Sequence, residues 1–441
     1  MTAQARSNFL HFLANSLVAF FVFTIPNNLF IKWVTPEAYV RGLLIDYLIP
    51  KVYLSDIVIF FMLLLLISQI NFKKIINSLN FKTALHSPKI APITFVLLFS
   101  GIQILFSNTP IATAWFLIQI VLAALVVLFM MQFEPYIAKK TILYSLSFTI
   151  LFQSLLGWYQ YLEERSLFGF WFFGEPNLTQ YSGIAKTSFG TIERVLAYGT
   201  TAHPNVLAGT LTLLWYCYFL LSKKNHWSIG ILGFVVISII FLTESMTGGL
   251  LFVGIISSII WRKQLEKVLT KHAKKLIAFF ILCLCVGIPL VLQFSERILI
   301  VDESFSRRIA LNDIALDLFM KKPLTGSGLN SFTASFEQVE KIDEVVRFVQ
   351  PAHNVAYLLL AETGILGVLL LLFLYSISTI KDRSIILFLM VLLLPVLALD
   401  HYLITLHTGR LSIALIVGVL LLLRKNELTN RPISHPKVEK D

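Results

Sequence analysis

Residues 111–131 read IATAWFLIQIVLAALVVLFMM and contain no charged side chain. A helix of about 20 mostly apolar residues is long enough to cross the hydrocarbon core of a membrane. The whole chain of 441 residues has this character: 57% of it is hydrophobic and only 14% is charged, whereas soluble domains average roughly 25% charged residues. We therefore expect an all-α, polytopic membrane protein and not a series of soluble domains.

Twelve stretches have this composition and a length close to that of a membrane span. They are 12–31, 53–70, 90–107, 111–131, 141–162, 203–221, 228–243, 247–261, 276–294, 353–378, 384–400 and 409–423. The first is expected to be a signal anchor and not a cleaved signal peptide, because many further spans follow it. Residues 1–426 are predicted to form one membrane domain, with residues 427–441 as a tail. Two connections are long, 163–202 and 295–352, and long loops often carry function.

Basic residues are distributed unevenly between the two sides of this predicted bundle. With the N-terminus inside, the inner segments hold 22 of the 36 Lys and Arg residues and 6 of the 25 Asp and Glu residues, a net charge of +16. The rest of the chain, with 14 basic and 19 acidic residues, has a net charge of −5. Since cytoplasmic loops are rich in Lys and Arg, this pattern places both termini in the cytoplasm and both long connections outside. The net charge of +11 is thus a topology signal, and no nucleic-acid partner is predicted.

The cysteines give no sign of a disulfide framework or a metal site. Cys217, Cys283 and Cys285 all fall within apolar spans, and none has the Cys/His spacing of a metal ligand set.

The strongest local motif is QPAHN at residues 350–354, directly before an apolar helix that contains ETGILG at residues 362–367. Pro351 ends any preceding helix, so His353 is expected at the outer mouth of the span, where an imidazole titrates near neutral pH. Tyr357 is predicted about one turn further along the same helix face. The alternative is that these residues are a polar helix cap at the level of the lipid headgroups.

A second motif begins with Arg194 and continues into His203-Pro204-Asn205 at the start of the sixth span. Pro204 suits a first helical turn, and His203 is placed like a cap residue. Capping alone would explain His203 and Asn205 equally well, and an arginine in a 40-residue loop is often only solvated.

Residues 306–323 have the pattern of an amphipathic helix about four turns long. Its predicted apolar face is Leu311, Ile314, Ala315 and Leu318. We expect this face to lie on the membrane surface, with Arg308, Asn312, Asp313 and Asp317 pointing away from it. Arg307 and Arg308 have planar guanidinium groups that can grip pyrophosphate oxygens through paired hydrogen bonds. The Thr-Gly-Ser-Gly stretch at 325–328 is predicted to be a turn.

Five further polar residues are weaker candidates: Glu244, Asp400, His401, Asp56 and Glu362. Asp56 follows Ser55 at the start of a span, and capping explains it best. Glu362 lies inside a span, and an acid at that depth is a candidate for function whose partner the sequence does not name.

These motifs together resemble a known family. His353-Asn354, followed after nine residues by Gly364 and after two more by Gly367, resembles the hallmark of the O-antigen ligases and the related O-antigen polymerases. The segments 323–332 and 194–209 are similar to that family as well. The resemblance covers about residues 160–405.

The resemblance implies a GT-C-like, metal-independent glycosyltransferase that needs no cofactor. Such enzymes move a glycan from undecaprenyl pyrophosphate to a hydroxyl of a lipid, protein or glycan acceptor at the outer face of the cytoplasmic membrane. It implies that Arg194 and Arg307 or Arg308 hold the pyrophosphate and that His353 orients or deprotonates the acceptor. The implied catalytic residues are His353, Arg308 and Arg194, and the implied substrate-binding residues are Arg307, His203, Asn205, Asn354, Tyr357 and Glu244.

One departure and several alternatives stay open. Relatives often have a Ser-Arg pair after the seventh span, where this chain has Glu244-Ser245-Met246-Thr247, so the number of cations on the pyrophosphate is undecided. Ligase and polymerase activity are not distinguished. Metal-dependent GT-C enzymes need closely spaced acids in the first outer loop, whereas Glu37, Asp46 and Asp56 are about ten residues apart. A lipid or polysaccharide transporter is the alternative from another class, but no repeated halves with broken helices are visible.

Overall fold

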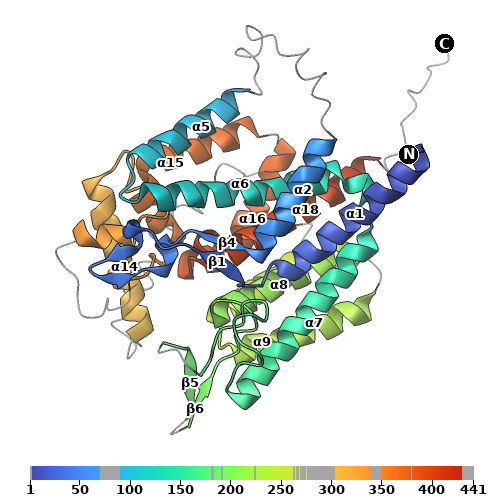
Figure 1. Cartoon of the computed structure of the whole chain (residues 1–441), viewed down its shortest axis with the longest axis horizontal. Helices are drawn as coiled ribbons and strands as arrows, with labels where there is room; N and C mark the ends of the chain where they lie inside the picture. The colour runs from blue at the N-terminus through green and yellow to red at the C-terminus, as the bar shows by residue number, and fades with distance from the viewer. Residues whose placement is uncertain are drawn as a thin grey trace.

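The computed structural model describes residues 2–69, 90–179, 183–189, 192–222, 225–261, 303–338, 349–378 and 380–429, together with positions 264, 268 and 275. This part of the chain is mostly helical (Figure 1). The α-helices are α1 (Ala3–Thr24), α2 (Leu54–Ser68), α5 (Ile90–Leu105), α6 (Pro110–Gln132), α7 (Lys139–Glu163), α8 (Pro204–Leu221), α9 (His226–Leu242), α10 (Met246–Ile260), α14 (Glu303–Lys321), α15 (Val355–Ile377), α16 (Ile380–Leu399), α17 (Tyr402–Thr405) and α18 (His407–Thr429). Short 3-10 helices are η1 (Pro36–Ala38), η2 (Asp46–Leu48), η3 (Glu134–Tyr136) and η5 (Ala334–Gln338).

The apolar helices follow the predicted spans closely. Six of them, in α1, α6, α7, α8, α15 and α18, are long and apolar enough to cross a membrane. Five shorter apolar helices, in α2, α5, α9, α10 and α16, coincide with five more predicted spans. The remaining predicted span, 276–294, lies outside the described residues. The chain is a multi-pass membrane protein, and the total of twelve spans stays a prediction.

The first predicted span, 12–31, has the wrong boundaries. Helix α1 already begins at Ala3 and ends at Thr24. Pro26 has no N–H to continue the helical hydrogen bonds, and the backbone N–H of Asn28 donates to the carbonyl of Thr200 (3.0 Å) instead. Residues that were predicted to be helical therefore form strand β1 (Phe30–Lys32).

Three two-stranded antiparallel sheets, absent from the all-α prediction, lie in two of the predicted outer connections. Strand β1 pairs with β4 (Lys51–Tyr53), β2 (Tyr39–Val40) with β3 (Leu43–Leu44), and β5 (Lys186–Phe189) with β6 (Ile192–Val195). Each strand has only two to four residues, which is too short for an alternating pattern to stand out in the sequence.

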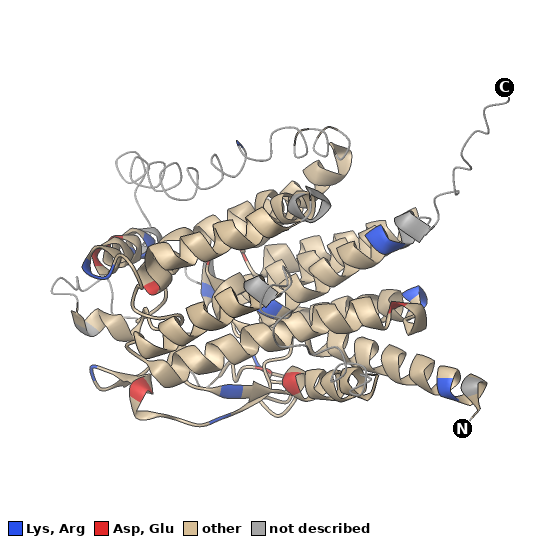
Figure 2. Cartoon of the chain, turned by 90° about the horizontal axis from the view of Figure 1, so that it is seen from above, with Lys and Arg blue, Asp and Glu red and all other residues tan. Residues whose placement is uncertain are grey.

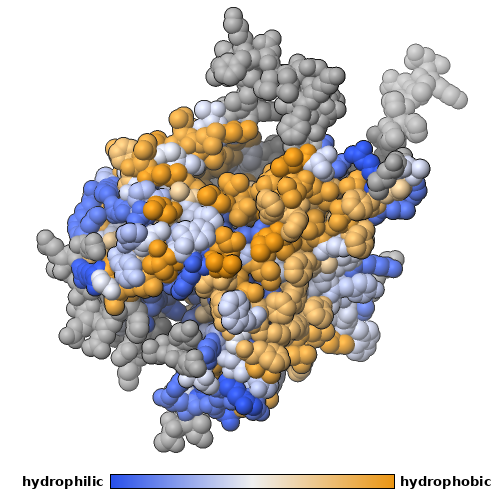
Figure 3. All heavy atoms as spheres, in the orientation of Figure 1, coloured by the Kyte–Doolittle hydropathy of each residue, from blue (hydrophilic) through white to orange (hydrophobic). Residues whose placement is uncertain are grey.

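The helix surfaces have the polarity of a protein in lipid. Large apolar side chains are exposed on outer helices, for example Phe12 (69%) on α1, Leu97 (66%) on α5 and Leu155 (70%) on α7. Hydrophobic residues cover much of the visible face, and hydrophilic residues gather toward its edges (Figure 3). Charged residues concentrate toward the two ends of the helices (Figure 2). A soluble monomer rarely exposes so large an apolar surface.

Helix α8 is the centre of the bundle. All thirteen residues of 206–218 are buried, and the helix contacts α7, α9, α10 and α18. Because Gly209 has no side chain, the hydroxyl of buried Tyr402 can lie directly against the α8 backbone. This contact brings the turn before α17 close to the N-terminus of α8, which places two parts of the site together.

The apolar face of helix α14 lies against protein, so the expectation that this face lies on the membrane surface was wrong. The predicted apolar face of Leu311, Ile314, Ala315 and Leu318 is buried, as expected. It packs in one cluster with Ala352, Leu358 and Ala361 at the start of α15. Asn312, which was predicted to point away, is buried too. An amphipathic pattern gives the apolar face but does not say whether lipid or protein covers it.

A break in α15 fixes α14 in place. Gly364 has φ +59° and ψ −158°, which interrupts the helix, so the N–H of Ile365 donates to the carbonyl of Pro323 (2.8 Å). The predicted turn at 325–328 inserts there, and the N–H of Gly328 donates to the carbonyl of Glu362 (2.8 Å). The Glu362 carboxylate in turn accepts the N–H of Phe332 (3.2 Å). Glu362, the acid predicted inside a span, therefore binds backbone groups of the loop that follows α14.

Candidate active site

The site is built where the starts of α8 and α15 meet the end of α16. His203 is the N-cap of α8, and its Nδ1 accepts the N–H of Asn205 (3.2 Å). The amide of Asn205 reaches across and donates to Oδ2 of Asp400 (3.1 Å). Residues nearly 200 positions apart are therefore joined by one hydrogen bond. Capping does explain His203, as the alternative interpretation held, but Asn205 has a second role.

Asp400 and His401 form the turn between α16 and α17, and both are buried. The Oδ1 atom of Asp400 accepts the N–H of His401 (2.8 Å). The carboxylate therefore stabilises the turn in which it lies and also binds Asn205. Nδ1 of His401 lies 2.6 Å from the hydroxyl of Thr405. This hydrogen bond fixes the plane of the His401 ring.

His353 lies just before the N-cap of α15 and packs edge-on against His401, with ring centroids 5.0 Å apart. Its side chain is partly exposed, but Nδ1 is buried with no hydrogen-bond partner in the described part of the chain. Arg308, on α14, is close enough for its charge to act on His353, His203, His401 and Asp400. Nε of Arg308 is also buried without a partner among the described residues. We call His203, Arg308, His353, Asp400 and His401 the histidine–arginine cluster.

Burial favours the neutral form of the imidazoles in the cluster. Burial, with help from neighbouring His401 and Arg308, lowers the pKa of His353 to about 3, although Asp400 acts against this change. Burial also lowers the pKa of His401 to about 4 and that of His203 below its usual value. Burial alone would raise the pKa of Asp400, but the histidines and Arg308 bring it below its ordinary value. The expected titration of His353 near neutral pH is therefore wrong, because burial and the positive charge of Arg308 both lower the pKa of the ring.

The pH dependence of activity follows from these values. A histidine whose pKa is lowered in the folded protein stays neutral until the pH falls close to that pKa. If neutral His353 is required, the rate of glycan transfer should be constant from pH 8 to pH 5 and fall only below that range. Transfer by reconstituted protein across this range, with folding followed by tryptophan fluorescence, checks the prediction. Loss of half the rate near pH 6.5 in a folded protein would contradict it.

Three other predicted residues lie near the cluster. Asn354 caps α15, since its Oδ1 accepts the N–H groups of Ala356 (2.9 Å) and Tyr357 (3.4 Å). Tyr357 is half-buried beside the core that α14 and α15 share. Arg307 is half-buried in the first turns of α14, next to Arg308. A role of these residues in substrate binding remains a prediction.

Arg194 and Glu244 lie outside the contacts that define the cluster. Arg194 is in β6, opposite Thr187, with its guanidinium 5.7 Å from the ring of Tyr161. Glu244 is exposed in the α9–α10 turn with a left-handed backbone (φ +48°). Met246, where relatives often have arginine, is 55% exposed at the first residue of α10. The structure therefore places Arg308 close enough for its charge to act on His353. Arg194 and Glu244 have no such interaction with the cluster in the described residues.

The three acids of the first outer segment have separate structural partners. Glu37 caps α6 by accepting the N–H of Ile111 (3.0 Å), and Asp46 pairs with Lys51. Asp56 accepts the amide of Gln119 (3.0 Å). The described residues contain no group of three His, Cys, Asp or Glu side chains placed to hold a metal ion.

Sequence reasoning gave Asp400 and His401 less weight than the residues around His353, although both belong to the cluster. The sequence feature that could have identified them is a charged residue next to a histidine in a short turn between two apolar spans. Only the fold shows that this turn lies against Asn205 and His353.

Comparison with known families supports the motif interpretation. Residues 231–372, about a third of the chain, match the O-antigen ligase family model. Over this stretch the chain is similar to O-antigen ligases. The matched residues include Arg308, His353 and the Gly364 break, and the match supports the predicted membership of the O-antigen ligase and polymerase family. No curated protein that was compared with the chain matches it.

The match also bears on function. A match to the O-antigen ligase model in a multi-pass membrane protein supports an enzyme that transfers a lipid-linked glycan, and it does not support the transporter alternative. The domain match is narrower than the predicted region of 160–405, so those wider bounds remain a prediction.

The contact between Gly209 and Tyr402 gives a test of how the site is assembled. Valine at position 209 would overlap the hydroxyl of Tyr402, which is buried and cannot retreat into solvent. We expect Gly209→Val to displace the Asp400 turn and to lower transfer by tenfold or more, of the order that small misplacements in active sites cause. Transfer should be compared with Gly230→Ala, a matched control, because a Cβ at Gly230 meets no atom within 4 Å. Full activity of Gly209→Val would contradict this account.

Proposed function

We propose that the protein transfers a glycan from an undecaprenyl-pyrophosphate carrier to an acceptor hydroxyl at the outer face of the cytoplasmic membrane. The observation that carries the proposal is a partly exposed His353 packed against His401, with the charges of Arg308 and Asp400 close enough to act on it and with Arg308 and His353 in the stretch that matches the O-antigen ligase model. An imidazole must be neutral to accept a proton, and a leaving group that gains negative charge needs a cation close by.

In the proposed reaction the acceptor hydroxyl approaches the exposed side of His353. Its oxygen forms a bond to the anomeric carbon of the donor sugar, while the bond from that carbon to the pyrophosphate oxygen breaks. The hydroxyl proton passes to His353, and the negative charge on the leaving pyrophosphate is stabilised by Arg308. Asp400 stabilises the positive charge that forms on His353, because a nearby carboxylate favours the imidazolium.

The unpartnered atoms of the cluster support this assignment of roles. Buried polar atoms nearly always have a hydrogen-bond partner, yet Nδ1 of His353 and Nε of Arg308 have none in the described residues. Hydroxyl and phosphate groups of substrates are suitable partners for these atoms. We propose that the enzyme has a GT-C-like architecture and acts without a metal ion, since a lipid pyrophosphate is already a good leaving group and mainly requires positioning and cations.

Arg194 is proposed as a second contact to the donor, from the hairpin β5–β6. His203, Asn205 and Tyr357 are proposed to line the acceptor side of the site.

Deletion of the gene followed by analysis of surface glycans tests the proposed function. Shortened chains would indicate a polymerase, and intact but unattached lipid-linked chains would indicate a ligase. Glycans of unchanged length and attachment in the deletion strain would overturn the proposal.

A further inference from the structure

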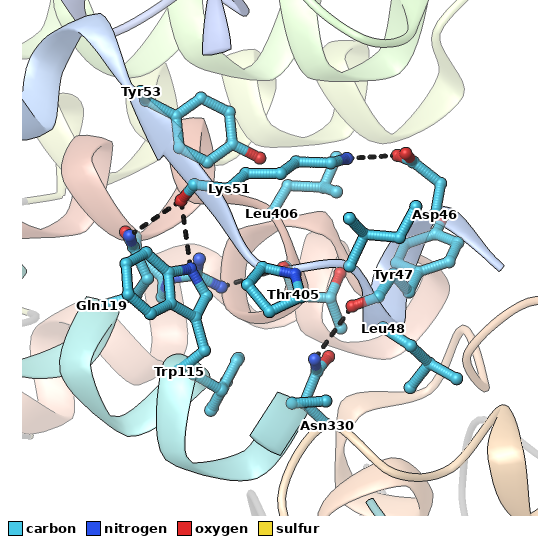
Figure 4. Close-up of a pocket in the computed structure, with 15 residues that line it drawn as sticks. Asp46, Tyr47, Leu48, Lys51, Tyr53, Trp115, Gln119, Asn330, Thr405 and Leu406 are labelled. Atoms are coloured by element: carbon cyan, nitrogen blue, oxygen red, sulfur yellow. Dashed lines mark hydrogen bonds and ion pairs between the residues drawn. The ribbon is translucent and has the colours of Figure 1, made fainter. Parts of the chain in front are cut away.

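A pocket next to the histidine–arginine cluster is lined by two basic side chains that the proposed reaction does not use (Figure 4). Lys51 from β4 and Arg410 from α18 both line this cavity of about 50 Å³. The pocket adjoins the cluster through its wall: the Tyr47 ring lies 5.6 Å from that of His401, and Thr405 holds Nδ1 of His401. We call this cavity the Lys51–Arg410 pocket.

Lys51 is a buried cation with an exposed partner. Its side chain is only 10% exposed, whereas the side chain of Asp46, with which it pairs, is 67% exposed. Figure 4 shows the ammonium group directed toward Asp46 at the edge of the pocket. Burial lowers the pKa of Lys51, so a second anion would stabilise its charged form. The carboxylate of Asp46 lies in water, so an incoming anion can compete with it for the ammonium group of Lys51.

Arg410 has donor capacity that the protein leaves unused. Its Nη1 donates to the carbonyls of Ile404 (2.7 Å) and Thr405 (2.8 Å), which fixes the side chain. Its Nε is buried without a partner in the described part of the chain. The nearby acid Asp56 accepts the N–H of Tyr53 (2.9 Å) and the amide of Gln119 (3.0 Å) through Oδ2, and its Oδ1 lies 3.4 Å from Nε2 of His407.

The position of the pocket in the fold also favours an anion. Thr405 and Leu406, which lie just before α18, and Arg410 in the first turn of this 23-residue helix line the pocket. The N-terminus of a helix carries partial positive charge and is a common binding place for phosphate. A cavity of about 50 Å³ accommodates a few water-sized groups, which suits one phosphate group better than a chain of sugars.

We propose that the Lys51–Arg410 pocket binds a phosphate group through Lys51 and Arg410, beside the N-terminal end of α18. The phosphate can belong to a polyprenyl pyrophosphate or to inorganic phosphate or pyrophosphate, since the recognising chemistry is the same. Binding at this site does not depend on glycan transfer.

Calorimetric titration of the full chain in phosphatidylcholine nanodiscs tests the pocket, with inorganic pyrophosphate and farnesyl pyrophosphate as ligands. Each titration is made with the wild type and with Arg308→Ala, so that the pocket is measured apart from the histidine–arginine cluster. We expect Arg410→Gln and Lys51→Met to raise Kd about tenfold, as loss of a charge-assisted hydrogen bond does. Asp46→Asn, at an exposed position, should lower Kd severalfold because it frees Lys51.

Lys186→Gln is the matched control, because Lys186 is exposed in an ion pair with Glu193 on the hairpin β5–β6. Changes for both ligands would support recognition of phosphate from any source, and changes for farnesyl pyrophosphate alone would support a lipid headgroup. Unchanged Kd values in both Asp46→Asn and Lys51→Met would overturn the proposal, even if the wild type transfers glycans. Changed Kd values in a protein that shows no transfer would support the pocket and contradict the proposed function.

Discussion

Replacing His353 with alanine is expected to lower the rate of glycan transfer by at least about a hundredfold, the usual effect of losing a general base. The variant should still insert and fold, because His353 is partly exposed and its Nδ1 holds no other described residue in place. Transfer by purified protein in liposomes, with a lipid-linked glycan as donor, measures the effect. His226→Ala is the matched control, since His226 is exposed at the start of α9, away from the cluster.

His353→Gln separates the two proposed roles of this histidine. Glutamine can orient a hydroxyl through a hydrogen bond but cannot take its proton near neutral pH. A loss as large as that of His353→Ala indicates proton transfer, whereas substantial recovery indicates orientation. Normal transfer by His353→Ala would remove His353 from the reaction altogether.

Replacing Arg308 with alanine is expected to lower kcat/KM by about a hundredfold to a thousandfold, the range for removal of one group that stabilises a developing negative charge. It should also weaken binding of the lipid pyrophosphate. Arg308→Lys should recover only part of the activity, because lysine keeps the charge but not the paired donors of a guanidinium.

Arg165→Ala is the matched control for Arg308, because Arg165 is 60% exposed in the loop after α7. Arg308→Ala removes a positive charge near His353 and His401, whose pKa values that charge lowers. The pH below which the rate falls should therefore be higher in this variant. Unchanged donor affinity together with an unchanged pH profile would show that Arg308 does not act in the site.

Much of the fold could be predicted because membrane spans depend on composition over about 20 residues. The apolar face of α14 was also visible, since Leu311, Ile314, Ala315 and Leu318 recur at helical spacing. Its location could not be predicted from that spacing. It depends on the break at Gly364, where the N–H of Ile365 bonds to Pro323 instead of continuing the helix.

The candidate site was predicted in part. His353 and Arg308 belong to motifs that stand out locally, and the structure places them in one cluster. Asp400 joins that cluster through the amide of Asn205, a contact between residues 195 positions apart that no local pattern encodes. The low pKa of His353 could not be predicted for the same reason, because it depends on burial of the ring by other segments of the chain.

The central claim is that the protein breaks the bond between a glycan and its lipid pyrophosphate. The most direct measurement is the amount of undecaprenyl pyrophosphate released by the purified protein in liposomes, determined together with the glycan joined to the acceptor. We predict one molecule of lipid pyrophosphate released for each glycan transferred, with both products lost in His353→Ala and Arg308→Ala. Movement of intact lipid-linked glycan across the bilayer, with no release of lipid pyrophosphate, would contradict the claim.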